Sequence, residues 1–192
     1  MKLYFCVIMV LLFSCSCGKK GVPIKEGKEK EELSIHLKEL KANNSIDNDS
    51  LMFIAEEIID AFPEEKAEVS VKLGNLFYAK SKLYLSRNYF KSAAQLYKES
   101  GKEELYAEQL TNIGVLNEVM GDYTASIKSY FEALSIFKKL NLELKSSYIY
   151  NNLGIVYQQL KEKEKSLEFY KKGLSLVLTL DRRDLSASKY NN

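Results

Sequence analysis

The chain has few of the residues on which enzyme chemistry most often depends. It contains one histidine, three cysteines and no tryptophan among 192 residues. His36 stands alone, which excludes histidine-based catalytic triads and metal sites with several histidine ligands. The cysteines lie between Cys6 and Cys17, so the rest of the chain has neither a disulfide framework nor a thiolate metal site. We expect a non-catalytic protein without cofactor or metal; a pair of carboxylates acting as a hydrolase is the weaker alternative.

The charge balance argues against nucleic acid as a direct partner. The 28 basic and 26 acidic residues give a net charge of +2, too even for a groove that follows a phosphate backbone. Lysine and glutamate alternate over 161–165, which is typical of a solvated helix face with weak ion pairs. The 13 tyrosines fit core packing better than base stacking, because most of them fall at repeated positions.

The chain repeats itself at a step of forty positions, which places Ile113-Gly114 over Leu153-Gly154. Self-similarity at a fixed step indicates a repeat protein. After each of these pairs, apolar residues recur at i, i+3, i+7 and i+10, which predicts an amphipathic second helix. These residues are Ile127, Tyr130, Leu134 and Phe137 in one copy and Leu167, Tyr170, Leu174 and Val177 in the other. Such a stripe is buried only when units stack.

Small residues explain how the two helices of a unit approach each other. Gly114 and Gly154 fall in the middle of a predicted helix, where glycine costs about 1 kcal/mol relative to alanine. We interpret their missing Cβ atoms as space for the second helix. Matching small residues on that helix are Ser126 and Ala133 in one copy and Ser166 and Gly173 in the other. Gly121-Asp122 makes the turn, and Asp122 is the predicted N-cap.

These positions together resemble the tetratricopeptide repeat. The matching pattern is Leu110, Ile113-Gly114, Gly121-Asp122-Tyr123, Ser126-Ile127, Tyr130 and Ala133-Leu134. The second copy departs from it at Lys161-Glu162-Lys163 and at Gly173, and the step exceeds the family's usual 34 residues, so either the helices or the turns are longer. The resemblance implies an all-α fold, a right-handed superhelical solenoid of helix-turn-helix repeats.

We expect about three such units over residues 64–181, with the later two at 102–141 and 142–181 and a disordered polar tail at 182–192. Gly101 is the predicted end of the first unit. Two registers compete in that unit. The sequence favours Ser81 in the glycine position, with Phe90, Ala93, Tyr97 and Ser100 aligned to the next unit at a 33-residue step; Gly74, forty residues before Gly114, is the rival.

The N-terminal region reads as an export signal followed by a tether. Lys2 precedes an apolar run that is too short to span a bilayer and fits a signal peptide over 1–14. The segment 12–15 resembles a bacterial lipobox, which implies that Cys15 is lipidated; Cys17 is the weaker cleavage site, and a cytosolic protein with an apolar N-terminus is the alternative. Residues 15–32 are expected to form a flexible tether. A helical pair, either a cap or a degenerate repeat, is expected over 33–63, its second helix running from Leu51 to Phe62.

The family resemblance also implies a binding face. In tetratricopeptide repeats the first helix lines a concave groove, and an asparagine two positions before the glycine often binds the backbone of a ligand. Asn112 and Asn152 occupy that position, and an amide can both donate and accept a hydrogen bond. The alternative is that these asparagines only bridge adjacent helices. Further residues expected on this face are Thr111, Val115, Glu118, Tyr148, Asn151, Ile155 and Gln158.

These features favour a protein-interaction scaffold that holds a peptide or protein partner in its groove. Through Cys15 it would be attached to a membrane of the bacterial cell envelope, where Ser16 favours the outer membrane, facing the periplasm or the surface. The alternative is the peptide-sensing input domain of a truncated envelope signalling regulator. No polar capping helix follows Leu174 to Leu180, so this edge either pairs with another copy or partner, or marks a truncation.

Overall fold

The computed structural model describes residues 48–190, and every regular element in this range is helical. The predicted signal peptide, lipidation site and tether, and the first helix of the N-terminal pair, lie outside it. The chain divides into two compact units at Val69 and Ser70. The described part of the first unit holds α3 (Asn48–Ala61), the 3-10 turn η1 (Pro63–Glu65) and the start of α4 (Lys66–Ala79). In α3, Leu51, Ala55 and Ile58 are buried at helical spacing.

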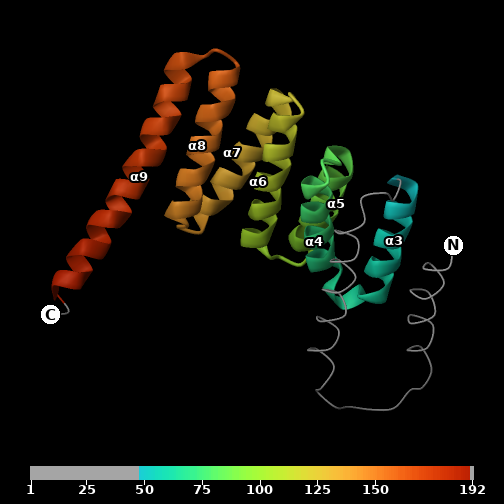
Figure 1. Cartoon of the computed structure of the whole chain (residues 1–192). Helices are drawn as coiled ribbons and strands as arrows, with labels where there is room; N and C mark the ends of the chain where they lie inside the picture. Colours follow the sequence, from blue (N-terminus) through green and yellow to red (C-terminus); the bar gives the residue numbers. More distant parts are fainter. Residues whose placement is uncertain (1–47, 191–192) are drawn as a thin grey trace. The chain divides into compact units, whose positions relative to one another are not determined.

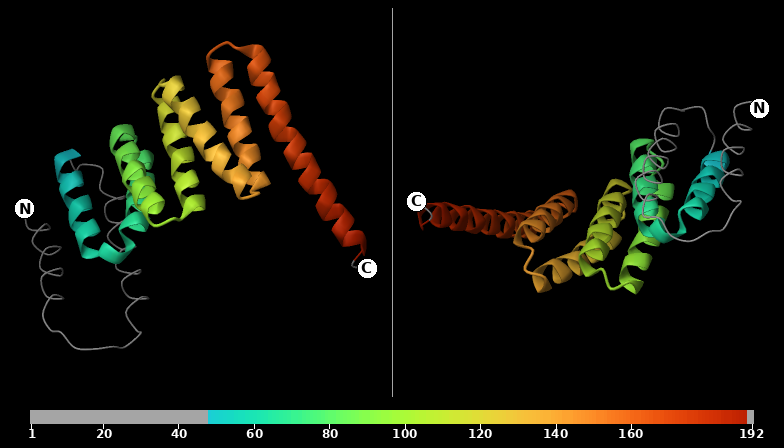
Figure 2. Two further views of the ribbon diagram at one scale, coloured as in Figure 1. Left: turned by 180° about the vertical axis from the view of Figure 1, so that it is seen from behind. Right: turned by 90° about the horizontal axis from the view of Figure 1, so that it is seen from below.

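Four helices of the second unit have equal length. After α4 come α5 (Leu83–Glu99), α6 (Glu103–Val119), α7 (Tyr123–Lys139) and α8 (Glu143–Gln159), each of 17 residues. From α5 to α9 (Lys163–Tyr190) each helix packs against the next in the order of the chain (Figure 1 and Figure 2). Because the connecting segments are short and uniform, the forty-residue step comes from longer helices and not from longer turns.

The turns between these helices share one backbone conformation. One residue in each turn has a positive φ, and these residues are Ser81, Gly101, Gly121, Asn141 and Lys161. The next amide N–H then bonds back to a carbonyl in the last helical turn, as from Asp122 to Asn117 at 2.8 Å, which is the Schellman arrangement. Two predictions are confirmed here: Gly101 ends its helix, and the Asp122 carboxylate caps α7 by accepting from the Ala125 amide at 3.0 Å.

Three glycines on first helices each lie against an aromatic ring of the following helix. A Cβ on Gly114 would lie 2.5 Å from Cε1 of Tyr130, and one on Gly154 would lie 2.6 Å from Cδ1 of Tyr170. The close approach predicted for these two glycines is confirmed. On Gly74 a Cβ would lie 2.7 Å from Cε1 of Phe90.

The position of Gly74 overturns the predicted register of the first unit. Gly74, Gly114 and Gly154 are equivalent at the forty-residue step, whereas Ser81 lies in the turn after α4 with φ of 57°. The hydrogen bonds agree, because Ser86 donates to the carbonyl of Gly74 and Ser166 to that of Gly154, both at 2.8 Å. The 33-residue match was wrong because it aligned the aromatic residues of α5 seven positions, about two helical turns, away from their equivalents.

The core lies between successive helices of the second unit. One cluster joins α7 to α8 and includes Tyr130, Leu134, Phe137, Ile149, Leu153 and Val156. The apolar stripe of α7 is therefore buried by the first helix of the next pair, as the stacking of amphipathic units requires.

The last helix differs from the others. α9 continues to Tyr190, past Asp181, where the repeat would place the next turn. The prediction of a disordered tail from Arg182 was therefore wrong as far as Tyr190, because polar composition alone does not end a helix and residues 182–190 contain neither proline nor glycine. Over residues 48–190, no helix is both long and apolar enough to span a membrane.

Candidate functional site

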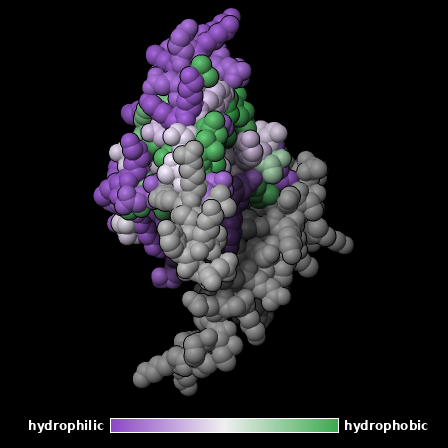
Figure 3. Space-filling model, turned by 90° about the vertical axis from the view of Figure 1, so that its left-hand side faces the viewer, coloured by the Kyte–Doolittle hydropathy of each residue, from purple (hydrophilic) through white to green (hydrophobic). Residues whose placement is uncertain are grey.

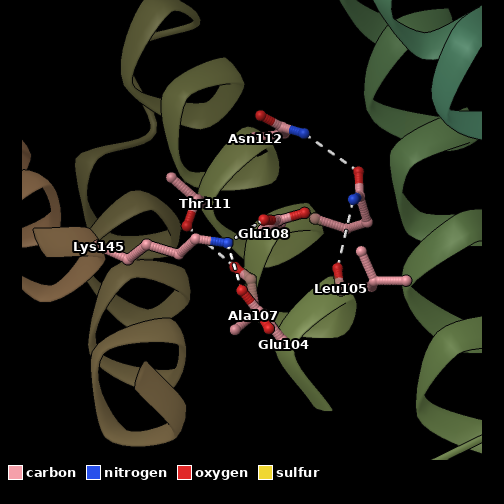
Figure 4. Close-up of polar contacts among 8 residues, drawn as sticks. Glu104, Leu105, Ala107, Glu108, Thr111, Asn112 and Lys145 are labelled. Carbon is pink, nitrogen blue, oxygen red and sulfur yellow. Dashed lines mark hydrogen bonds and ion pairs between the residues drawn. The ribbon is translucent and has the colours of Figure 1, made fainter. Parts of the chain in front are cut away.

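The first helices of the last two pairs, α6 and α8, are joined by a charged contact. Lys145 on α8 is ion-paired with Glu104 at 2.6 Å and with Glu108, both on α6 (Figure 4). Burial lowers the pKa of Lys145, but the hydrogen bonds and charges of the two carboxylates outweigh it and raise the pKa on balance. These contacts place one side of α6 beside one side of α8. We define the α6–α8 face as Glu104, Glu108, Thr111 and Glu118 with Lys145, Tyr148, Asn151 and Gln158.

Two of the predicted binding residues on α6 make hydrogen bonds within their own helix. The Thr111 hydroxyl donates to the carbonyl of Ala107 at 2.9 Å. The Asn112 amide donates to the side chain of Gln109 at 3.1 Å, and Gln109 is buried. Figure 4 shows Asn112 on the side of α6 away from Lys145. Asn112 therefore lies beside the α6–α8 face rather than at its centre.

Asn152 lies close to the hydroxyl of a buried tyrosine. Tyr130 donates to the Glu118 carboxylate at 3.0 Å. Burial and the Glu118 charge raise the pKa of Tyr130, while hydrogen bonding with Asn152 acts in the opposite direction. Burial also raises the pKa of Glu118, and the hydrogen bond from Tyr130 opposes this. Asn152, Tyr130 and Glu118 thus link three successive helices, which agrees with the bridging interpretation of this asparagine.

The same hydrogen bond recurs one repeat later. Tyr170 on α9 donates to the Gln158 side chain on α8 at 3.0 Å. Glu118 and Gln158 are equivalent at the forty-residue step, as are Tyr130 and Tyr170. Glu118 and Gln158 therefore each accept a hydrogen bond from a tyrosine hydroxyl, Glu118 through a carboxylate and Gln158 through an uncharged amide.

Three of the predicted residues are exposed: Tyr148, Asn151 and Gln158, the last of which already accepts from Tyr170. Asn151 is exposed, and 60% of the Tyr148 surface is accessible. They are flanked by Leu144, which is exposed, and by Ile155, which is half-buried. Tyrosine offers a large apolar ring with a polar tip, and asparagine offers a donor and an acceptor. This part of the face can thus provide both apolar contact and hydrogen bonds to an extended chain.

Sequence reasoning missed the residues that fix this geometry. Lys145 follows Glu104 by 41 residues and Glu108 by 37. Both separations are close to the forty-residue step, so the step could have predicted that these side chains lie together on adjacent first helices. The tyrosines were expected only to pack in the core, so the hydrogen bonds that their hydroxyl groups donate were not predicted. Within the described residues, no group of three or more His, Cys, Asp or Glu side chains is arranged to hold a metal ion.

Comparison with known families settles the class of repeat. The family model described as "Tetratricopeptide repeat" matches residues 105–178, which span α6, α7, α8 and the first part of α9. Over these residues the chain consists of tetratricopeptide repeats. This class of repeat generally serves as a scaffold for protein interactions and not as a catalytic fold.

Among curated proteins, this tetratricopeptide repeat protein is similar to Response regulator aspartate phosphatase I of Bacillus subtilis. The two are 29% identical over 127 residues, which is 60% of this chain. The match spans 32% of the phosphatase, about a third of its length.

Two solved structures share the fold. BtubC (BKLC) from P. vanneervenii superposes with a TM-score of 0.55 at 15% identity, over 78% of this chain and 72% of that one. MamA superposes with a TM-score of 0.54 at 16% identity, over 85% of this chain and 99% of that one. Together with the family match they confirm the predicted fold class, an all-α right-handed solenoid.

Proposed function

We propose that this tetratricopeptide repeat protein is a non-catalytic scaffold that binds an extended peptide or protein segment along the α6–α8 face. The observation that carries the proposal is the exposure of Tyr148 and Asn151 beside a face whose other polar groups are already held in place. Lys145, Glu108 and Glu118 have partners within the fold, so they are ordered before a ligand arrives. Preorganised groups lower the entropic cost of binding.

The structure changes the weight of the predicted binding residues. Asn112 and Asn152 interact with Gln109 and with the Tyr130 hydroxyl, so a ligand would have to compete with contacts already made. We therefore assign ligand contact first to Tyr148 and Asn151, and a supporting role to Asn112 and Asn152. Thr111, Glu118 and Gln158 complete the proposed site at its edge.

A peptide-display selection tests this assignment. A random peptide library on phage is selected against the wild-type protein, and the enriched peptides are measured by titration against Tyr148→Ala/Asn151→Ala. Loss of a buried aromatic anchor should weaken binding by about tenfold or more. Lys128→Ala/Ser135→Ala, two exposed positions on α7, is the matched control and should bind as the wild type does. Equal binding to all three proteins, or no enrichment, contradicts the proposal.

We further propose that Cys15 attaches the protein to a membrane of the bacterial cell envelope, with the outer membrane favoured by Ser16. The lipobox-like segment before Cys15 supports this. Metabolic labelling with a fatty-acid probe tests it: Cys15→Ala should abolish labelling, and Cys17→Ala should not. Labelling lost only in Cys17→Ala would place the anchor at Cys17, and labelling retained in both would exclude an anchor at either residue.

A second candidate is the peptide-sensing input domain of an envelope signalling regulator. It is favoured by the similarity to a response regulator aspartate phosphatase, of which this chain spans about a third. Sequencing the DNA beyond the stop codon tests it. An in-frame apolar run of about 20 residues, long enough to span a bilayer, would support this candidate over the scaffold alone.

A further inference from the structure

The outer face of α9 presents apolar side chains whose equivalents on α7 are buried. Leu174 is 59% exposed, whereas Leu134 is 6% exposed; Val177 is 42% exposed, whereas Phe137 is 2% exposed. These pairs are separated by the forty-residue step, and the difference arises because α8 covers the residues of α7. Figure 3 looks at the α9 side and shows green apolar side chains among purple polar ones.

This face of α9 follows a regular pattern in the sequence. Starting at Glu164, one set of positions recurs with alternating steps of three and four, which is the a/d heptad pattern of a helix that packs against another helix. The set is Glu164, Leu167, Lys171, Leu174, Leu178, Asp181, Leu185 and Ser188. The residues of α9 that face α8, such as Phe169 and Gly173, are buried and do not belong to the set. The described members of the heptad set, from Glu164 to Asp181, are all exposed and therefore lie on a side of α9 that α8 does not cover.

The central positions of this set are complementary to themselves when read in reverse. In an antiparallel pair of helices each a position faces a d position of the other helix. With the twofold axis near Leu176, Leu174 faces the partner's Leu178 and Lys171 faces the partner's Asp181. The first of these layers is apolar, and the second pairs opposite charges.

We propose that two copies of this chain associate through an antiparallel contact of their α9 helices, centred near Leu176. The described side chains that form its centre are exposed: Leu174, Leu178, Lys171 and Asp181. The extension of α9 to Tyr190 lengthens the contact, because the turn expected at Asp181 is absent. This interface uses none of the residues that define the α6–α8 face.

The charges select the direction of the pair. In a parallel pair the same positions would meet themselves, so Lys171 would face the partner's Lys171 and Asp181 the partner's Asp181. Like charges within a packed layer are unfavourable, and a charged residue at a core position fixes orientation at some cost in stability. The antiparallel register removes both repulsions and replaces them with opposite-charge pairs.

Charge reversal tests the register as well as the dimer. Sedimentation equilibrium of the full chain in a density-matched non-ionic detergent gives the dissociation constant of the dimer. Lys171→Glu alone and Asp181→Lys alone should each weaken the dimer by about tenfold or more, because either change creates two like-charge layers. The double variant Lys171→Glu/Asp181→Lys restores opposite charges and should bind within about threefold of the wild type.

Further variants separate the interface from the fold. Leu174→Asp should give a monomer, while Ser135→Asp, exposed on α7, should not. Circular dichroism checks that each variant keeps its helicity. A wild type that stays monomeric, single reversals that leave the dissociation constant unchanged, or a double variant no tighter than the weaker single variant would each overturn the proposal. A monomeric wild type would instead leave the α9 face to a helix from a different chain.

Discussion

Replacing Gly114 by alanine tests the packing rule that fixes the register of the repeats. Alanine should gain about 1 kcal/mol in helix propensity, so on local grounds the substitution stabilises. The added Cβ would, however, lie 2.5 Å from Cε1 of Tyr130, whose side chain is fully buried. Overpacking of this kind costs about 1–3 kcal/mol, and moving the ring also strains the 3.0 Å hydrogen bond to Glu118. We expect a net loss of about 1–2 kcal/mol.

Gly154→Ala is the matched comparison. Its Cβ would lie 2.6 Å from the Tyr170 ring, almost the same distance, but Tyr170 is only half-buried and lies on α9, which no further helix of the described residues covers. That ring can move away, so we expect a change within about 0.5 kcal/mol of zero. Urea unfolding followed by circular dichroism measures both variants. A Gly114→Ala protein at least as stable as the wild type, or equal losses in the two variants, would show that ring contact at Gly114 does not limit its substitution.

Two further predictions each concern a single hydrogen bond, and a third concerns one carboxylate. Asp122→Ala should cost about 1 kcal/mol in urea unfolding through loss of the N-cap, and Asp122→Ser should recover most of it; equal losses would contradict the cap. Ser86→Ala should cost about 1 kcal/mol because it removes a buried bond to the Gly74 carbonyl, and an unchanged midpoint would contradict this. Because burial raises the pKa of Glu118, the folded state binds its proton more tightly than the unfolded chain, and stability from this group falls as pH rises above its ordinary value of 4.5. Glu118→Gln keeps an acceptor for Tyr130 and should flatten that fall, as unfolding at several pH values would show; an unchanged pH profile would contradict it.

The helices and their caps could be predicted from the sequence because each depends on local chemistry. The spacing of Ile127, Tyr130 and Leu134 predicts an amphipathic helix, and Asp122 marks its start. The close approach at Gly114 could also be predicted from the sequence. A glycine inside a helix lowers helix stability, so its presence indicates a compensating contact such as close packing of a second helix.

The register of the first unit and the end of α9 could not be predicted in the same way. Ser81 adopts a positive φ that serine rarely takes, so nothing local identified it as a turn residue, and the aromatic residues of α5 offered a false match. At Asp181 the repeat predicts a turn, but the three-dimensional structure continues the helix.

The candidate site shows the same limit, because its residues lie one repeat apart. The sequence placed Asn112 and Asn152 on the ligand side by family resemblance. It could not show that Gln109 and the Tyr130 hydroxyl already engage them, since those contacts depend on how far each helix is rotated. Exposure, which distinguishes Tyr148 and Asn151 from Thr111, Asn112 and Asn152, is a property of the packed structure alone.

Photo-crosslinking in cells that produce the protein tests the scaffold proposal most directly. A benzoylphenylalanine residue is placed at Tyr148 on the α6–α8 face and, in a second protein, at Ser135 on α7. We expect a specific peptide or protein adduct from position 148 that is absent from position 135 and is reduced by Asn151→Ala. Adducts of equal yield from both positions, or an adduct from position 135 alone, would contradict binding along the α6–α8 face.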